Sequence, residues 1–246
     1  ASDVYKRQDR EFLMPHLTVS HLTVSYGRTC AVDDVSWSLG PGFHALLGPN
    51  GAGKTSLLTA LATLVRPTKG TIALDGREGK DIRSFLGYCP QDNLGKSSFT
   101  VAQHLEYMCW LRKIPSADTN AEVARILSII DLEDRAGQRI RALSGGMRRR
   151  VAIGSALVGD PALVVLDEPS AGLDIGQREA LTKILGAVAG HAITIVSTHL
   201  VEDIIDHAQT ITVMNSGRFV FDGSCEDFSD TRSLDAVRRT YLRLVD

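Results

Sequence analysis

One glycine-rich segment has the residues and spacing needed to hold a phosphate chain. GPNGAGKT, from Gly48 to Thr55, fits the pattern G-x-x-x-x-G-K-[ST] in full. Glycines let backbone N–H groups wrap a phosphate, Lys54 would reach the β- and γ-phosphates, and the Thr55 hydroxyl would bind Mg²⁺. An apolar strand precedes the segment and an apolar helix follows it, so a glycine turn that binds nothing is the weaker interpretation. The predicted nucleotide-binding residues are Gly48, Pro49, Asn50, Gly51, Ala52, Gly53, Lys54, Thr55 and Ser56.

A pair of carboxylates ends a second apolar stretch, LVVLDE. Strand ends of this kind lie at the carboxyl edge of a parallel sheet, where such folds bind ligands. Asp167 would hold Mg²⁺, directly or through water, and Glu168 would act as the general base on the water that attacks the γ-phosphate. Alone, such a pair is more often a helix cap or a solvated edge. Together with the phosphate loop, it predicts a hydrolytic site.

The hydrophobic pattern predicts the elements that position these residues. Segments 17–27 and 32–39 alternate in the manner of antiparallel strands, the first resembling an edge strand. Segments 161–168 and 191–199 are short apolar runs typical of buried parallel strands. Residues 100–130 have helical periodicity with a break at 114–118. The predicted class is α/β: a P-loop NTPase core with a mixed sheet, an N-terminal antiparallel β-subdomain, and an inserted α-helical subdomain at about 92–150.

Composition narrows the function classes. Of 246 residues, 27 are Lys or Arg and 29 are Asp or Glu, which gives a net charge of −2. The chain as a whole therefore has no positive field that would attract nucleic acid, and nucleic acid is not expected as a partner. The four cysteines are widely spaced, which favours free thiols in a reducing compartment. No run approaches the roughly 18 apolar residues of a membrane span.

The chain is predicted to hold one domain with two short extensions. Residues 1–13 form a polar leader, either a native disordered tail or a non-native extension. The domain covers 14–230. Residues 231–246 contain one amphipathic helix with Leu234, Val237, Tyr241 and Leu244 on its apolar face.

With these motifs in order, residues 17–223 resemble the nucleotide-binding subunit of an ATP-binding-cassette (ABC) transporter. The resemblance implies that Tyr26 stacks on adenine, that Gln91 is the Q-loop glutamine beside Mg²⁺, and that His199 is the switch histidine of the catalytic site. It also identifies LSGGM, residues 143–147, as the signature and SAGLD, residues 170–174, as the D-loop. Each motif is weak alone. In this order and at this spacing they support one another.

The resemblance also implies a dimer with shared sites. In the family, the residues at Ser144, Gly145 and Gly146 begin a helix and bind the γ-phosphate held by a second subunit, either the same chain or a homologous ATPase, arranged head to tail. The positive end of a helix favours such an anion. The arginines at 148–150 are expected to form structural and interface salt bridges. Arg149 departs from the family, which often has glutamine there.

Two functions remain open within this family. One is an ATP-hydrolysing subunit, peripheral on the cytoplasmic face of the membrane, that powers transport through a separately encoded transmembrane permease; segments 144–174 and 201–223 look most like exporters of the ABC-2 type. The alternative is a soluble ATPase in nucleic-acid or translation-linked work. Neither the long heptad repeats of chromosome and repair proteins nor a second cassette is present. The cargo is not predicted.

The helical segment 101–112 carries a possible partner surface. At about 100° per residue, one side gathers small and aliphatic residues, while the other holds Gln103, His104 and Glu106 together with Tyr107 and Trp110. Either the next helix, at about 118–130, covers these two rings, or they join Phe99 and the segment after Gln91 in a groove that receives a short permease helix. Large amphipathic rings are enriched at protein interfaces.

Overall fold

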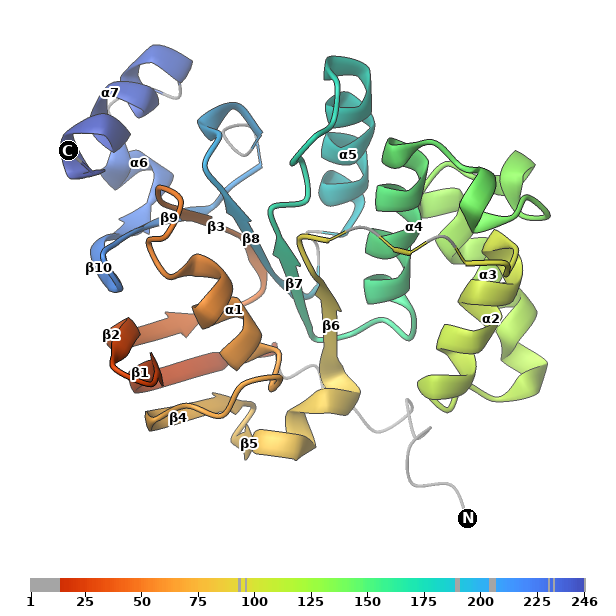
Figure 1. The fold of residues 1–246 in the computed structure, drawn as a ribbon, viewed down its shortest axis with the longest axis horizontal. Helices are drawn as coiled ribbons and strands as arrows, with labels where there is room; N and C mark the ends of the chain where they lie inside the picture. The colour runs from red at the N-terminus through yellow and green to blue at the C-terminus, as the bar shows by residue number, and fades with distance from the viewer. Residues whose placement is uncertain are drawn as a thin grey trace.

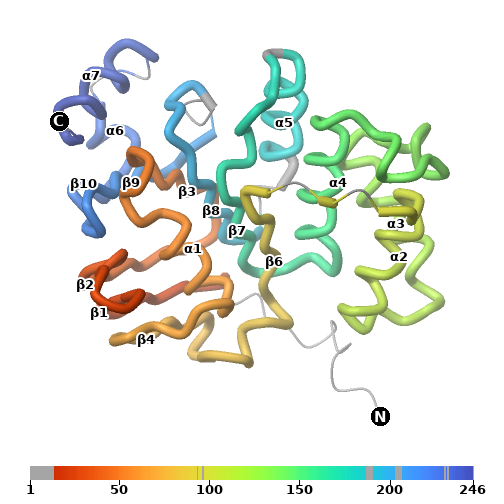
Figure 2. Tube along the Cα trace, in the orientation of Figure 1, coloured from red at the N-terminus to blue at the C-terminus, as the bar shows by residue number. Residues whose placement is uncertain are grey.

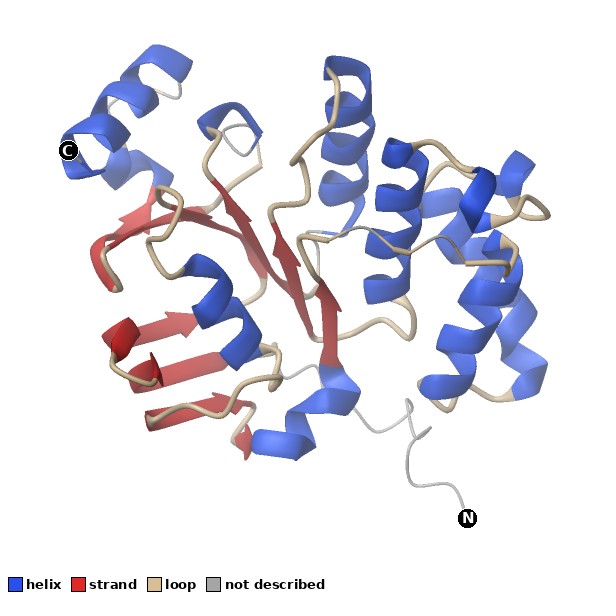
Figure 3. Cartoon of the chain, in the orientation of Figure 1, coloured by secondary structure: helices blue, strands red, loops and turns tan. Residues whose placement is uncertain are grey.

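The computed structural model describes residues 14–245 except 93, 96, 189–190, 204–206, 230 and 232 (Figure 1). The predicted leader, 1–13, lies outside the described residues. Two sheets and several helices make up this part of the chain, and helix α1 (Lys54–Leu61) packs between the two sheets (Figure 3). Phosphate loop, carboxylates and histidine all lie on the larger sheet.

The smaller sheet is antiparallel, as the alternating pattern predicts. Its four strands follow the order β2-β1-β4-β5. The expectation of an edge position for β1 was wrong, because β1 pairs with β2 on one side and with β4 on the other. Alternation reports that one face of a strand is buried, and it carries no information on how many neighbours the strand has. The strands are β1 (Leu17–Tyr26), β2 (Thr29–Leu39), β4 (Lys69–Leu74) and β5 (Arg77–Glu78).

The larger sheet is mixed, with the order β10-β9-β3-β8-β7-β6. All neighbours are parallel except the β10–β9 pair. The two apolar runs predicted as buried parallel strands are β7 and β8, and every residue in both is buried. The strands are β3 (Gly42–Leu47), β6 (Leu86–Cys89), β7 (Leu163–Asp167), β8 (Ile193–Thr198), β9 (Thr210–Asn215) and β10 (Arg218–Ser224).

Successive residues of β7 enter two different hydrophobic clusters. Leu163 and Val165 pack with α1 (Lys54–Leu61) and the smaller sheet, whereas Val164 and Leu166 pack with α4 (Gly145–Leu157) and α5 (Ile175–Val188). Side chains of a strand alternate between the two faces of its sheet. Helix α1 and helix α4 therefore cover opposite faces of the larger sheet, as Figure 1 shows.

Two helices lie beyond α4, at the far end from α1 (Figure 2). Helix α2 (Val101–Leu111) starts at a capping box, in which the Thr100 hydroxyl accepts from the Gln103 N–H and the Gln103 side chain accepts from the Thr100 N–H. Helix α3 (Ser116–Ile129) follows the predicted break and packs on α2 and α4. Short 3₁₀ turns are η2 (Gly79–Phe85), η3 (Glu133–Arg135), η4 (Ile140–Ala142) and η5 (Val201–Asp203).

The chain ends in α6 (Cys225–Phe228) and the amphipathic helix α7 (Leu234–Val245). Val237 and Tyr241 are buried, whereas Leu234 is 40% exposed and lies off the packed face. Burial raises the pKa of Tyr241, and the negative charge of Glu168 raises it further, so α7 lies within electrostatic reach of the predicted site.

All four cysteines are free thiols. Burial raises the pKa of Cys89 and of Cys109 to about 11 each, so both are neutral near pH 7 and act as small apolar residues. None of the helices in the described part of the chain has the length and apolarity needed to cross a bilayer.

Candidate nucleotide-binding site

The predicted motifs follow four adjacent strands of the larger sheet. The glycine-rich loop follows β3, His199 follows β8, the carboxylate pair ends β7, and Gln91 follows β6. Because these strands are parallel, their carboxyl ends meet at one edge. The sheet thus brings residues about 150 positions apart in the chain to one place.

Two glycines of the loop are required by its geometry. Gly53 caps the start of α1 at φ 106°, and a Cβ there would lie 2.1 Å from the Ala31 carbonyl oxygen. A Cβ on Gly48 would lie 2.3 Å from the Met214 carbonyl oxygen. Both contacts are far shorter than any real carbon–oxygen contact, so side chains are excluded at these positions. The loop is therefore fitted closely between β2, β9 and α1.

Glu168 is buried and lies at the centre of a polar cluster with buried Lys54 and exposed His199. Its Oε1 is 3.2 Å from the Lys54 Nζ, and its Oε2 is 2.9 Å from Nδ1 of His199. Lys54 also donates to the Gly48 carbonyl at 2.7 Å. Glu168 has φ 45°, a conformation that a non-glycine residue rarely adopts and that is concentrated at functional sites. The structure thus joins three residues that the sequence predicts to be catalytic.

Asp167 has one carboxylate oxygen bound and one unbound. Ser197 donates its hydroxyl to Oδ1 at 2.7 Å and accepts from the Glu168 N–H at 2.9 Å. Oδ2 is buried and has no hydrogen-bond partner among the described residues. An unpaired buried carboxylate oxygen is costly unless something binds it, so this atom fits a cation ligand such as Mg²⁺. The role of Ser197 was missed; its signal was its position two residues before His199 on the neighbouring strand.

The remaining predicted residues of this edge lie around the cluster. Asn50, Gly51 and Thr55 are exposed, which leaves the top of the loop open to a ligand. Gln91 is exposed, and its carbonyl oxygen accepts from Arg149 at 3.0 Å. Tyr26 is 48% exposed at the tip of the β1–β2 hairpin, whose second strand contacts Gly53 through Ala31.

The signature residues lie at the start of α4, on the other face of the sheet from α1. The Ser144 hydroxyl caps the helix by accepting from the Met147 N–H at 3.2 Å. Ser144 and Gly145 are exposed. Gly146 is buried, and a Cβ there would lie 2.4 Å from the Gln177 side-chain oxygen. This helix start therefore faces solvent, separate from the chain's own glycine-rich loop.

The arginine run follows the expectation at one position and departs from it at another. Arg150 forms the expected salt bridge, with Asp131 at 3.0 Å. Arg148 donates to the Leu143 carbonyl. The expected salt bridge for Arg149 was wrong, because its partners among the described residues are backbone carbonyls, and it is 1% exposed. A sequence pattern cannot distinguish a carboxylate partner from a carbonyl partner.

The aromatic rings of α2 are not covered by α3. Trp110 is 70% exposed, Tyr107 46% and Phe99 45%. Tyr107 stacks on Trp110 with ring centroids 5.9 Å apart and meets Phe99 edge-on. The alternative in which the next helix covers the rings was therefore wrong. His104 was expected on this outward side, but it turns toward α4 and bonds the Ser155 hydroxyl at 2.9 Å.

Comparison with known proteins agrees with this geometry. The ABC transporter family model matches residues 32–171, which contain the loop, the signature and the carboxylate pair. The chain belongs to the ABC transporter family. Its structure is also similar to a solved ATP-binding subunit of an ABC transporter, with a TM-score of 0.81, 24% identity, and coverage of 93% of this chain and 98% of that one. The expected P-loop α/β fold is confirmed.

The sequence of this ABC chain is similar to those of two bacterial proteins and one human protein. It is 35% identical to Nod factor export ATP-binding protein I of Ralstonia nicotianae, over 85% of this chain and 67% of that protein. It is 32% identical to daunorubicin resistance ATP-binding protein DrrA3 of Streptomyces coeruleorubidus, over 90% and 72%. It is 34% identical to human phospholipid-transporting ATPase ABCA3, over 89% of this chain but 13% of that protein. The ABC chain thus spans a small part of the human relative.

Proposed function

We propose that this chain binds and hydrolyses Mg²⁺-ATP and thereby powers export through a separate membrane protein. The observation that supports this proposal most strongly is that Lys54 and His199 bind the two oxygens of the buried Glu168 carboxylate. Nod factor export protein I is named for export and DrrA3 for drug resistance, which favours the exporter assignment.

In the proposed mechanism, ATP competes for the Lys54 ammonium. Lys54 now bonds Glu168 and the loop carbonyls, and phosphate oxygens would take over as its acceptors. Glu168 is then free to accept a proton from the attacking water at its carboxylate, while His199 holds the other oxygen. Asp167 and Thr55 would hold Mg²⁺, with Gln91 beside it, and the ion would supply charge neutralisation at the phosphates.

Each composite site would need two chains. Ser144, Gly145 and Gly146 begin a helix on the opposite sheet face from the chain's own glycine-rich loop, so their N–H groups serve an anion presented by another molecule. The proposed partner is a second copy, or a homologous ATPase, arranged head to tail. Tyr26 would stack on the adenine of the chain's own ATP.

Replacing Lys54 with alanine tests the nucleotide site directly. Loss of one charge-assisted hydrogen bond costs about 2 kcal/mol, so we expect roughly 30-fold weaker ATP binding. The measurement is titration with a fluorescent ATP analogue, with Lys80→Ala, an exposed lysine in η2, as the control. Equal affinity in Lys54→Ala and the unchanged chain would contradict the assignment.

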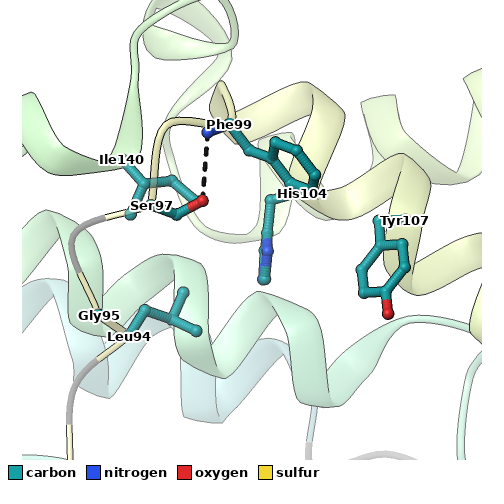
Figure 4. A pocket seen from close by; sticks show the side chains of 7 residues that line it. All are labelled: Leu94, Gly95, Ser97, Phe99, His104, Tyr107 and Ile140. Atoms are coloured by element: carbon teal, nitrogen blue, oxygen red, sulfur yellow. Dashed lines mark hydrogen bonds between the residues drawn. The ribbon is translucent and has the colours of Figure 1, made fainter.

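A hollow beside the rings of α2 is the proposed permease contact. It has a volume of about 380 Å³, and Figure 4 shows its lining side chains, with Tyr107 and Phe99 at one end. Leu94, Gly95 and Ser97 line it, and they belong to the segment after β6 that begins at Pro90 and includes Gln91. A short cytoplasmic helix seated here would touch both the rings and the segment leading to the Mg²⁺ ligands. The proposed location is therefore the cytoplasmic face of the membrane, through the permease.

Truncation of the rings is expected to separate hydrolysis from assembly. Trp110→Ala and Phe99→Ala leave basal ATP hydrolysis nearly intact, because neither ring contacts the carboxylate cluster. Truncating an interface anchor costs about 2 kcal/mol, so permease binding weakens roughly 30-fold for Trp110→Ala. Co-purification with the proposed membrane partner measures it, with Val220→Ala, an exposed residue of β10, as the control. Normal co-purification of both ring variants would remove the hypothesis, and loss of folding in the isolated chain would indicate a core role.

A further inference from the structure

All three guanidinium nitrogens of Arg149 donate hydrogen bonds to backbone carbonyls after β6 and at the end of β7. Its Nε donates to the Pro169 carbonyl at 3.0 Å, Nη1 to Pro90 at 2.5 Å and Gln91 at 3.0 Å, and Nη2 to Asp167 at 2.7 Å and Glu168 at 2.9 Å. Arginine carries five N–H donors, so every donor is used. The acceptors belong to the segment after β6, to the last residue of β7 and to the segment that follows it.

This arrangement depends on arginine chemistry. Five converging carbonyl oxygens leave a strongly negative, buried pocket, and a planar five-donor fork can satisfy all of them. Lysine has three donors on one atom, and glutamine has two. One of the bonded carbonyls belongs to Glu168, whose left-handed backbone needs support from its surroundings.

Arg149 also lies on α4, one turn after the helix start formed by Ser144, Gly145 and Gly146. The same helix packs against β6 and β7. One side chain therefore fixes three parts of the molecule to each other: the signature helix, the segment that begins at Pro90 and Gln91, and the backbone that carries Glu168.

We infer that Arg149 is a positioning residue that links hydrolysis at the chain's own ATP to the position of its signature helix. The inference rests on the proposed composite sites. In that dimer, α4 of one chain binds the ATP of its partner, while Glu168 acts on the chain's own ATP. Arg149 joins α4 to the Glu168 backbone within one chain. Binding of the partner's ATP by α4 therefore fixes the position of the Glu168 carboxylate at the chain's own ATP.

Arg149→Lys and Arg149→Gln test this inference against Arg150→Gln as the matched control. Arg150 is the next residue of the same helix, and its bonds go to Ile130 and Asp131 at the end of α3, away from the site. The measurements are steady-state ATP hydrolysis over a range of ATP concentrations, ATP affinity in the absence of turnover, and thermal unfolding to set the assay temperature below every midpoint.

The expected result is a loss of kcat with little change in affinity. Misplacing a catalytic group by about 1 Å costs up to about 100-fold in rate, so Arg149→Gln should lower kcat about 10- to 100-fold. ATP affinity stays within about twofold, because no bond of Arg149 reaches the phosphate loop. The Hill coefficient, which can approach about 2 for two linked sites, falls toward about 1. Arg149→Lys recovers part of kcat, and Arg150→Gln stays near the unchanged chain.

Three results would overturn the inference. The first is a kcat and a Hill coefficient for folded Arg149→Gln within about twofold of the unchanged chain. The second is a lowered kcat with the Hill coefficient retained, because the link between the sites would then lie elsewhere. The third is a loss of activity that matches the unfolded fraction. Should Arg149→Gln fail to fold, the same criteria apply to Arg149→Lys. Absence of ATP hydrolysis by the unchanged chain would instead refute the proposed function.

Discussion

Replacing Glu168 with glutamine is expected to lower the rate of ATP hydrolysis about 100- to 10,000-fold, the range that a general base contributes. Glutamine keeps the shape of the side chain and one acceptor oxygen but cannot accept the proton of the attacking water. ATP binding should persist, because the glycine-rich loop is unchanged. Phosphate release under saturating ATP measures the rate, and ATP retained after gel filtration measures binding.

The control for this variant is Glu78→Gln, at an exposed position on β5 in the smaller sheet. It makes the same chemical change away from the carboxylate cluster and should leave turnover within about twofold. Near-normal turnover in Glu168→Gln would show that another group accepts the proton. Loss of both turnover and ATP binding would indicate that Glu168 acts mainly through its ion pair with Lys54.

Replacing Gly145 with aspartate is expected to abolish ATP-dependent dimerisation. A Cβ at Gly145 meets nothing within 4 Å, and an acidic residue in the first turn suits a helix start, so the single chain should fold normally. In the proposed dimer, the new carboxylate would lie beside the partner's γ-phosphate. Two like charges about 4 Å apart repel by about 4 kcal/mol at an effective dielectric constant of 20, about three orders of magnitude in the dissociation constant.

The clearest measurement uses the Glu168→Gln background, in which ATP persists. Light scattering should report a dimer with ATP and a monomer with ADP, and Gly145→Asp should remain monomeric with both. Gly137→Asp is the matched control, because a Cβ at Gly137 also meets nothing within 4 Å and the residue is exposed. An ATP-bound dimer of Gly145→Asp, or a fully active monomer, would contradict the shared site.

Local patterns were sufficient to predict the residues of the chemistry. The spacing from Gly48 to Thr55 and the buried run ending at Asp167 and Glu168 are properties of short segments, and each lies where its element predicts. The order β3-β8-β7-β6 is a different kind of information. No short segment contains it, so the sequence alone could not show that Glu168 contacts both Lys54 and His199, or that Ser197 bonds Asp167.

The errors have physical causes of the same kind. Periodicity on α2 correctly separated the buried Leu105 from the outward Trp110, but the packing of α3 decides whether Trp110 is covered. In the sequence, Arg149 is the middle one of three consecutive arginines, a pattern that predicts a polar, exposed helix turn. Its burial follows from the approach of the β6 and β7 loops, which lie 58 and 20 residues away in the chain.

The strand order also has a consequence for synthesis on the ribosome. Strand β3, which ends at Leu47 and presents the glycine-rich loop, pairs with β8 and β9, which begin at Ile193 and Thr210. The nascent chain must therefore carry β3 without its neighbours until nearly all of the described sequence has been translated. By contrast, β1, β2 and β4 are complete by Leu74 and can pair early. Such long-range parallel pairing is slow, so β3 is the strand most exposed to misassociation and chaperone capture before nucleotide can bind.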